Sequence, residues 1–459
     1  MRRAAFAAVS ALLVLGVVPS VRAELNPAEG VPLAPLVELD QLPVEPAATS
    51  DNLTYLGTIP FDSPGVGARV VTVDGQRRLY VSGVPGLSIY DVTEPEAPML
   101  LGHLPLPNWE NEDVSVSADG DWTLITEYTG TFYVHVIDTR NPRVPLLASS
   151  ITLGSAGHTS ECLDKACNWV YGSEGQILDL RDKLNPILLE QEWTDLLGLP
   201  DGHAINIDAA GLATIDTTPL TMADLRNPMA PKILAKAPAN EQEENATAYQ
   251  HNTLRPQADL WRARRTGADR KDKSLRPGEL ILGNGETNFT GTCDDGSGPF
   301  ATWSARDWDR GAPLQVLDVF RPVNGSYTDG NPALNGLGCS GHWFSTRSIV
   351  GGGGDQIVAA GWYEHGTRLL RVDAQTGAIT QLGFHQPVVG SASAAHWEGT
   401  RHIYVIDYER GIDILRFEPD GPVPTTSQLD ASWLAKADVI SPLAESERQL
   451  CTLYATNEV

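Results

Sequence analysis

One segment recurs along the chain: a β-rich stretch that ends in Asp, a polar turn that contains Pro, and then a Leu-rich stretch. Its clearest copies are Leu87 to Leu101, Val136 to Leu147, Ile177 to Leu189 and Met222 to Leu234. The aspartates of these copies, Asp91, Asp138, Asp179 and Asp224, are separated by 47, 41 and 45 residues. That length accommodates four short strands with tight turns, which is the size of one propeller blade. The repeat therefore predicts a β-propeller.

Weaker copies extend the count to seven units, and the last unit lacks its outer strand. The weaker copies are Thr302 to Asp307, Leu369 to Asp373 and the half copy Gly411 to Phe417. Near the N-terminus, the segment Leu53–Pro60 resembles the outer strand of the first unit and could complete the last one. Such closure removes exposed sheet edges, which otherwise promote aggregation. We expect an all-β, seven-bladed β-propeller closed by an N-terminal strand that completes the last blade.

The first 23 residues have the layout of a secretory signal peptide. Arg2 and Arg3 precede an apolar run from Ala4 to Val18, and a small-residue cleavage site ends at Ala23. The run is shorter than the roughly 20 apolar residues of a membrane-spanning helix, and no later stretch is long enough to span a bilayer. We therefore expect a secreted protein, extracellular or periplasmic, with no membrane span.

The remaining domain boundaries follow from the repeats. We place an N-terminal extension at residues 24–51, the propeller at 52–417 and a C-terminal tail at 418–459. Blade five carries an insertion at about 255–277 that contains seven Lys and Arg residues from Arg262 to Arg276. This basic island could dock an anionic partner, pair with the protein's own carboxylates or form a solvated loop. The sequence assigns no role to the tail.

Composition limits the classes of partner. The formal net charge is -25, which argues against a general nucleic-acid binder, because phosphate binding needs clustered Lys and Arg. Hydrophobic residues make up 42% of the chain and charged residues 20%, which excludes disorder as the dominant state. We expect a monomer that recognises an extracellular ligand or protein, and neither the ligand nor the partner can be named.

The chain has five cysteines, and in an exported protein these favour disulfides. Cys162 and Cys167 are close enough to clip a local loop. Cys293 and Cys339 lie in two Gly-rich segments and could tie two loops together, which leaves Cys451 over. Metal ligation is the alternative, but the spacings match no zinc pattern.

The repeats resemble those of the LVIVD-repeat family of secreted and cell-surface β-propeller proteins. The resemblance covers roughly residues 52–417, and it is strongest in Leu87–Val92 and Val134–Thr139, each followed by the Pro-containing turn. It implies export and a propeller fold. It implies no activity, because the family has no shared catalytic motif.

Histidines recur where the innermost strand of each blade is expected to start. Aligning the blades there brings together His158, His203, His251, His342 and His396, with Asp113 and Arg69 at the same place in blades two and one. The intervals from Arg69 through Asp113, His158 and His203 to His251 are 44, 45, 45 and 48 residues. Only 10 of the 459 residues are His, so five at one position form a pattern.

Innermost strands line the central channel of a propeller, so these imidazoles are expected to point toward one axis. Three or four of them could hold a transition metal, Cu, Fe or Zn, with Asp113 as a ligand or as a partner that orients a His. Carotenoid oxygenases and the copper-dependent methanethiol oxidase family, which this arrangement distantly resembles, bind metals in this way. Structural hydrogen bonds between strands, as in the Gly-His pairs of WD-repeat propellers, are the alternative. Glu161 and Tyr249 are candidate ligand-binding residues at the same mouth, with Asp113.

Two classes of function stay open. The first is an exported binding or scaffold protein that recognises a ligand or partner at the propeller face or central channel. The alternative is a metal-dependent enzyme, an oxidoreductase, with the His cluster at the propeller axis. The sequence does not decide whether the protein is an enzyme, and it identifies no catalytic residue.

Overall fold

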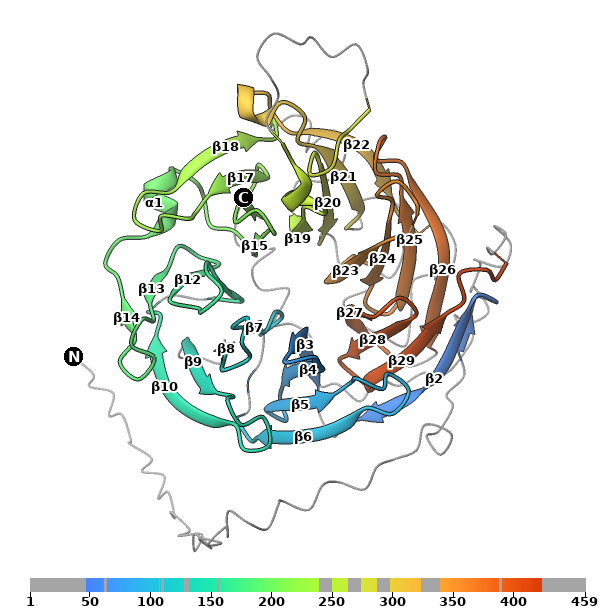
Figure 1. The fold of residues 1–459 in the computed structure, drawn as a ribbon, viewed down its shortest axis with the longest axis horizontal. Helices are drawn as coiled ribbons and strands as arrows, with labels where there is room; N and C mark the ends of the chain where they lie inside the picture. The colour runs from blue at the N-terminus through green and yellow to red at the C-terminus, as the bar shows by residue number, and fades with distance from the viewer. Residues whose placement is uncertain are drawn as a thin grey trace, which may run out of the picture. The chain divides into compact units, whose positions relative to one another are not determined.

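The structure is a computed structural model. It describes residues 47–61, 64–106, 108, 111–127, 132–154, 157–238, 250–262, 274–286, 298–322, 339–349, 351–387 and 390–422. All of these belong to one compact unit, Leu36–Val459. They form seven antiparallel sheets around a common axis, as Figure 1 shows, so the predicted all-β, seven-bladed propeller is confirmed.

The first four blades follow the chain from the inner strand to the outer strand. Blade one comprises β3 (Gly65–Val73), β4 (Gln76–Gly83), β5 (Leu87–Asp91) and β6 (Met99–Leu104). Blade two comprises β7 (Ser115–Val116), β8 (Trp122–Glu127), β9 (Tyr133–Asp138) and β10 (Leu146–Thr152). Blade three comprises β11 (Ser160–Cys162), β12 (Trp169–Gly172), β13 (Ile177–Asp179) and β14 (Ile187–Leu188). Blade four comprises β15 (Ile205–Ile207), β16 (Ala213–Ile215), β17 (Thr221–Asp224) and β18 (Lys232–Lys236).

The last three blades keep this order, and blades six and seven also include strands from the N-terminal part of the chain. Blade five comprises β19 (Gln250–Leu254), β20 (Leu280–Gly285), β21 (Phe300–Ser304) and β22 (Gln315–Phe320). Blade six comprises β23 (Phe344–Ser348), β24 (Gln356–Gly361), β25 (Thr367–Val372) and β26 (Ile379–Pro387), with β1 (Ala47–Thr49) beside β26. Blade seven comprises β27 (Ala392–Glu398), β28 (His402–Asp407), β29 (Gly411–Phe417) and β2 (Leu53–Pro60). The short helices of the described residues are α1 (Trp193–Leu197), η2 (Ala258–Leu260) and η3 (Trp308–Arg310).

Ring closure occurs through β2, as predicted. This strand pairs antiparallel with β29, from Leu53 opposite Phe417 to Pro60 opposite Gly411. The strand β1 was not predicted: residues 47–49 were placed in the N-terminal extension, but they pair with β26 as a fifth strand of blade six. The N-terminal part of the propeller is therefore attached to two neighbouring blades.

In the four clearest copies of the repeat, the aspartate ends the third strand of a blade and shapes the turn that follows. The Oδ1 atoms of Asp138, Asp179 and Asp224 each accept a hydrogen bond of 3.1 Å from the backbone N–H two residues later. This is the local hydrogen bond of an Asx turn. The same aspartates accept further hydrogen bonds from Arg140, Arg181 and Arg226, respectively. The repeat thus conserves turn geometry from one blade to the next within this chain.

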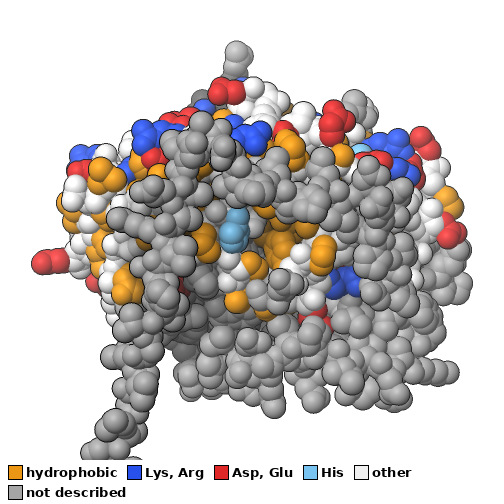
Figure 2. All heavy atoms as spheres, turned by 90° about the horizontal axis from the view of Figure 1, so that it is seen from below, with side chains coloured by type: hydrophobic (Ala, Val, Ile, Leu, Met, Phe, Trp, Pro, Cys, Tyr) orange, Lys and Arg blue, Asp and Glu red, His pale blue; other side chains and the backbone are white. Residues whose placement is uncertain are grey.

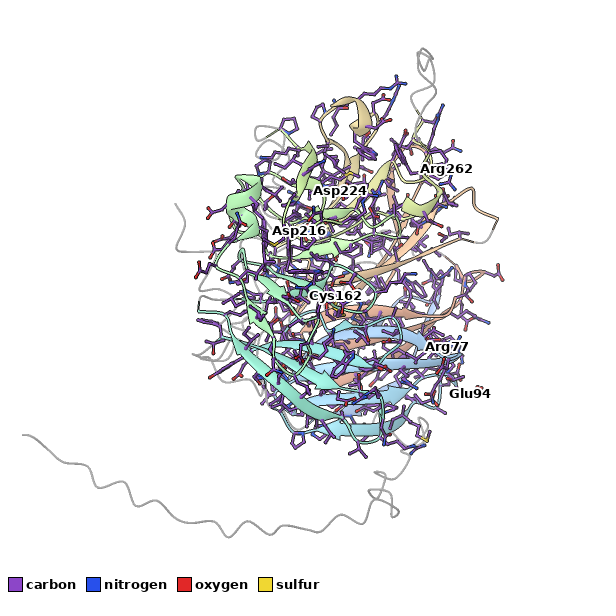
Figure 3. The ribbon with its side chains drawn as sticks, turned by 60° about the vertical axis from the view of Figure 1, so that its left-hand side comes forward. Arg77, Glu94, Cys162, Asp216, Asp224 and Arg262 are labelled. Atoms are coloured by element: carbon purple, nitrogen blue, oxygen red, sulfur yellow. A yellow bond between two sulfur atoms is a disulfide. The ribbon has the colours of Figure 1, made fainter. Side chains whose placement is uncertain are left out.

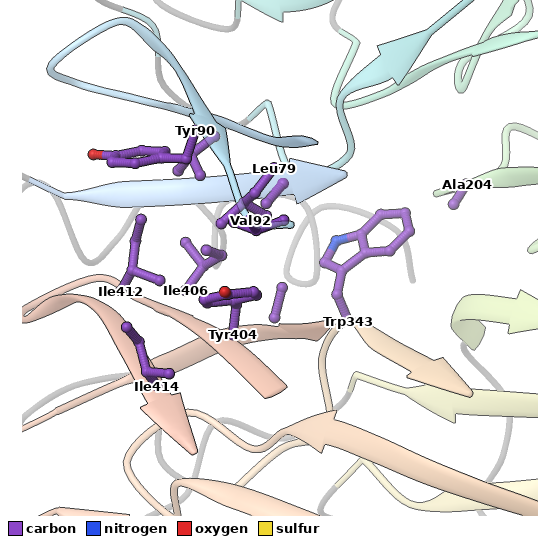
Figure 4. Close-up of a cluster of buried hydrophobic side chains, with 12 residues drawn as sticks. Leu79, Tyr90, Val92, Ala204, Trp343, Tyr404, Ile406, Ile412 and Ile414 are labelled. Atoms are coloured by element: carbon purple, nitrogen blue, oxygen red, sulfur yellow. The ribbon is translucent and has the colours of Figure 1, made fainter. Parts of the chain in front are cut away.

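The hydrophobic core is divided into seven clusters, one at each interface between neighbouring blades. Figure 4 shows the cluster between blades one and seven, where Leu79 and Tyr90 face Tyr404 and Ile412. β-strands place alternate side chains on opposite faces, and each blade packs against a neighbour on both faces. Both faces of a blade are therefore apolar here. On the rim, hydrophobic side chains are interspersed with charged ones over the described part of the surface in Figure 2.

One predicted disulfide, Cys162–Cys167, is formed in blade three, where Figure 3 labels Cys162. Cys339 is also disulfide-bonded. Cys293 and Cys451 lie outside the described residues, so the proposed Cys293–Cys339 pair stays a prediction. The signal peptide, Tyr249, most of the basic insertion and the tail from residue 423 also lie outside them. None of the helices in the described residues has the length and hydrophobicity that a membrane crossing requires.

Candidate metal centre

Six ionisable side chains meet at the axis, where the inner strands start. They are Glu112, His158, His203, His251, Glu286 and His342, which we call the hub cluster. Their donor atoms form three groups, each within 4.8 Å: Glu112 with His251 and His342, Glu112 with His158 and His203, and Glu286 with His203 and His251. All six residues are buried, and His251 and His342 are completely inaccessible.

The inner strands start in a common register, which hydrogen bonds between neighbouring blades show. We call the residue of each blade at this place the hub position. His203 Nδ1 bonds the carbonyl oxygen of His251 at 3.2 Å, and His342 Nδ1 bonds that of Ser393 at 2.7 Å. Ser393 Oγ in turn donates to the carbonyl oxygen of Val66 at 2.6 Å. Val66, His251 and Ser393 are each the extra residue of a β-bulge. Bulges re-aim side chains and are common next to active sites.

This register corrects the predicted alignment in three blades. The residues at the hub are Glu112 in blade two, Ser393 in blade seven and Val66 in blade one. Asp113 is therefore one residue past the hub position, and His396 and Arg69 are each three residues past it. The structure brings together four of the five predicted histidines, whereas His396 belongs to none of the three groups in the described residues.

The Glu112 carboxylate lies at the centre of the hub cluster. Its Oε2 is 3.0 Å from His251 Nε2 and 3.4 Å from His203 Nε2, and its Oε1 is 3.2 Å from His342 Nε2. Two ligand atoms about 2.0–2.1 Å from one metal are about 2.9 Å apart at right angles and about 3.4 Å apart at tetrahedral angles. The separations observed here span that range. The described side chains therefore fit a bound metal ion, with small shifts.

Backbone contacts fix how the imidazoles present their nitrogens. Because a carbonyl oxygen only accepts, Nδ1 of His203 and of His342 donates, and Nε2 of each ring faces Glu112. Nε2 of His251 lies 3.0 Å from Glu112 Oε2, and its Nδ1 is buried with no hydrogen-bond partner among the described residues. The two alternatives for the histidines, structural hydrogen bonds and metal binding, are therefore compatible. Nδ1 atoms bond neighbouring blades, while Nε2 atoms face the hub.

A glycine before the histidine permits the close approach in blade six. A Cβ atom on Gly341 would lie 2.0 Å from Asn284 Oδ1. Asn284 Nδ2 donates to the carbonyl oxygen of His342 at 2.6 Å. Glycine at this position therefore lets β20 hold the His342 backbone in place.

The electrostatics of the hub cluster set the four titrating groups apart. Burial would raise the pKa of Glu112, but His342, His251 and His203 hold it well below its ordinary value. Burial and the neighbouring His251 ring lower the pKa of His203 well below its usual range, and burial with His342 lowers that of His251. Burial would also lower the pKa of His342, but Glu112 outweighs it and raises the value. Of these three rings, His342 is therefore the one whose protonated form Glu112 favours most.

Sequence reasoning missed Glu112, Glu286 and the groups that hold them. Trp343 Nε1 donates to Glu112 Oε2 at 3.0 Å, and the Tyr363 hydroxyl donates to Glu286 Oε1. Glu286 follows the second strand of blade five and is 6% exposed. The only sequence signal for Glu112 was its position one residue before Asp113. The β-bulges shift the alignment of the inner strands, so the blade alignment selected Asp113 in place of Glu112.

The predicted ligand-binding residues Asp113 and Glu161 lie on the other side of Trp343. Together with Arg69 and His396 they line a pocket of about 430 Å³ formed by residues of several blades, which we call the mouth pocket. Figure 4 shows the Trp343 indole pointing toward Ala204 of blade four, with which it shares one hydrophobic cluster. Trp343 thus contacts the hub cluster through Nε1 and lines the mouth pocket with its ring.

Comparisons with known proteins support the fold and no family assignment. No protein-family model and no curated protein matches the chain. The β-propeller domain of Cps50 (Swd1) from Myceliophteria thermophila aligns with a TM-score of 0.50 and 15% identity, over 79% of this chain and 99% of that domain. A putative 6-phosphogluconolactonase from Bacteroides fragilis aligns with a TM-score of 0.45 and 11% identity, over 75% of this chain and 88% of that one. At such identities the first similarity shows the propeller fold alone.

Proposed function

We propose that the protein is an exported, metal-dependent oxidoreductase that binds a first-row transition metal in the hub cluster. The observation that carries the proposal is the convergence of three imidazole Nε2 atoms within 3.4 Å of one buried carboxylate. The Glu112 carboxylate and the Nε2 atoms of His203, His251 and His342 would be the ligands, with His158 and Glu286 beside them. Binding through Nε2 of His342 would require that nitrogen to carry no proton.

The donor set is compatible with iron and with the other candidate metals. Each of the three groups combines two histidines with one carboxylate. This composition occurs in non-haem Fe(II) oxygenases and in catalytic zinc sites, and imidazole also suits Cu. When bound, an Fe ion would supply one-electron and dioxygen chemistry. Cu and Zn remain alternative occupants that metal analysis separates.

The chain's own residues orient the ligands and exclude water from the hub. Trp343 fixes the Glu112 carboxylate from the side of the mouth pocket, and Tyr363 fixes Glu286. The backbone carbonyls of His251 and Ser393 fix the rings of His203 and His342. Such outer contacts raise metal affinity because they hold each donor in its binding orientation.

Export is part of the proposal. The resemblance of the repeats to the LVIVD-repeat family and the layout of residues 1–23 support a secreted or periplasmic protein that acts as a monomer. A binding or scaffold function is the second candidate, and the mouth pocket is the observation that favours it.

Metal analysis of protein purified without a His tag tests the proposal. We expect close to one metal per chain in the wild type, and loss of it in His203→Ala and His251→Ala. The matched control is His103→Ala, because His103 is exposed on β6 at the rim. A wild-type protein that stays metal-free after incubation with Fe(II), Cu(II) and Zn(II) would overturn the proposal.

Nitric oxide, a surrogate for dioxygen, tests the redox part. Added to the ferrous protein without oxygen, it should give an electron paramagnetic resonance signal of an iron–nitrosyl complex, which requires an open coordination position. We expect that signal in the wild type and in His103→Ala. A protein that takes up only Zn(II), or iron that binds no nitric oxide, would contradict an oxidoreductase and leave a structural metal.

A further inference from the structure

Among the described residues, the mouth pocket shares none of its lining with the three groups of possible metal ligands. Residues that follow the hub position by one or three along the inner strands line it, among them Asp113, Glu161, Asn206 and His396. Its volume of about 430 Å³ falls in the range of small-molecule sites, roughly 300–1,000 Å³. The Trp343 ring lines the pocket on the side of the hub cluster.

The charges of the mouth pocket are already paired with each other. Arg69 Nη1 lies 2.9 Å from Asp113 Oδ2 and 3.5 Å from Glu161 Oε2. Arg255, the first residue of the basic insertion, lies 2.6 Å from Asp208 and is completely buried at its side chain. An ionic ligand would therefore lose hydration without gaining an unpaired counter-charge, which is unfavourable.

The remaining lining groups suit a neutral ligand with many hydroxyls. The carboxylate oxygens of Asp113 and Glu161 accept hydrogen bonds, while the amides of Asn206 and Asn252 both donate and accept. The Oδ1 atom of Asn252 is buried and has no hydrogen-bond partner among the described residues. Trp343 and Trp397 add indole rings, which can pack against the apolar face of a ligand.

We propose that the mouth pocket is a binding site for a neutral carbohydrate of one or two sugar rings. A sugar presents hydroxyls that both donate and accept around its edge and C–H groups on its faces. Those two features match the polar and the indole parts of the lining. The site goes beyond the proposed metal function, because none of its ligand contacts requires a metal.

Isothermal titration calorimetry tests the proposal with a defined panel of sugars. The neutral probes are D-glucose, N-acetyl-D-glucosamine, cellobiose and maltose, and the charged probes are D-glucuronate and D-glucosamine. We expect at least one neutral probe to bind at least tenfold more tightly than either charged probe. Preferred binding of a charged probe, or no binding of any of the neutral probes, would overturn the proposal.

Two neighbouring alanines supply a matched pair of variants. Ala209 and Ala210 are both exposed after β15, but only Ala209 lines the mouth pocket. Ala209→Trp should weaken sugar binding at least tenfold by filling the pocket, and Ala210→Trp should leave it unchanged. Equal effects of the two variants would place the sugar elsewhere. His251→Ala should lose metal and keep sugar binding, so failure of the metal proposal and failure of this one are distinguishable.

Discussion

At the scale of single residues, Glu112 is the position on which the hub depends most. Glu112→Gln keeps the shape of the side chain but removes the negative charge that faces three imidazoles. We expect metal affinity to fall at least about tenfold, since altering even groups outside the ligand shell has that effect. Competition with a chromophoric chelator measures the affinity.

The neighbouring carboxylate is the control for this prediction. Asp113 points to Arg69 on the side of the mouth pocket, with Oδ2 2.9 Å from Nη1. Asp113→Asn should therefore leave metal affinity within about twofold of the wild type. The opposite result, with Asp113→Asn losing metal and Glu112→Gln keeping it, would support the alignment predicted from the sequence, in which Asp113 faces the hub.

The pH dependence of stability tests the environment of Glu161. Burial raises the pKa of Glu161 to about 7, and Asp113 adds to that effect, although Arg69 opposes it. Between the ordinary value of about 4.3 and 7, the unfolded chain binds fewer protons at this residue than the folded chain, so stability falls as pH rises. Glu161→Gln cannot ionise and lacks this penalty.

The expected readout is the difference in melting temperature between Glu161→Gln and the wild type. It should be smallest near pH 5, where the folded wild type keeps this carboxyl protonated, and should grow in favour of the variant up to pH 8. Arg69, Asp113 and His396 face the same pocket, so their contributions are common to both proteins. A difference that does not change with pH would contradict the raised pKa.

At the scale of elements, the repeated aspartate sets the turn after the third strand. Asp224, labelled in Figure 3, accepts a backbone hydrogen bond from Arg226 N and a side-chain one from Arg226 Nε. Asp224→Ala removes both and should lower the free energy of unfolding by about 1 kcal/mol. Urea denaturation measures this change.

Arg226→Met separates the two contributions. It keeps the backbone hydrogen bond of the turn and removes only an ion pair whose arginine is exposed. Exposed ion pairs contribute about 0–1 kcal/mol, so this variant should be close to the wild type. If Arg226→Met cost as much as Asp224→Ala, the ion pair rather than the turn would explain why the repeat contains Asp.

Elements were predicted well where the sequence repeats and poorly where it departs from a regular strand. The Asp-ended strands and the closing strand Leu53–Pro60 were visible because their side-chain pattern recurs. The hub register was not, since Val66, His251 and Ser393 lie on bulges, and a bulge adds a residue that alternation cannot count. Four histidines were found because their type is rare, whereas Glu112 and Glu286 are acidic residues in an acidic chain.

At the scale of the whole molecule, sequence alone established the blade number because seven copies of one unit leave few other closed arrangements. The strand β1 escaped prediction because only three residues pair, and no repeat precedes them. Of the mouth pocket, only Asp113 and Glu161 were predicted. Its lining comes from several blades, so it exists only once the ring has closed.

Closure of the ring depends on a buried polar network between β2 and β29. Arg410 Nε donates to Asp413 Oδ2 at 2.9 Å, and Arg410 Nη2 donates to the hydroxyls of Tyr55 and Thr58 at 2.9 and 3.1 Å. The Thr58 hydroxyl also donates to Asp413. Asp413 is 1% exposed and Arg410 is 9% exposed. The network therefore joins the two ends of the propeller sequence through groups that water does not reach.

Asp413→Ala should consequently destabilise the whole propeller and not only its last blade. Removing one partner of a buried ion pair costs about 3–5 kcal/mol, and Asp407, which also interacts with Arg410, offsets part of that loss. Replacing both partners by apolar residues is often neutral. We expect the double variant Asp413→Leu, Arg410→Met to recover most of the stability in thermal denaturation. Because β2 is the outer strand of blade seven, the single variant should also speed hydrogen exchange in both β2 and β29. Exchange that rises only in blade seven's inner strands, or a double variant as unstable as the single one, would show that closure rests on the hydrophobic clusters instead.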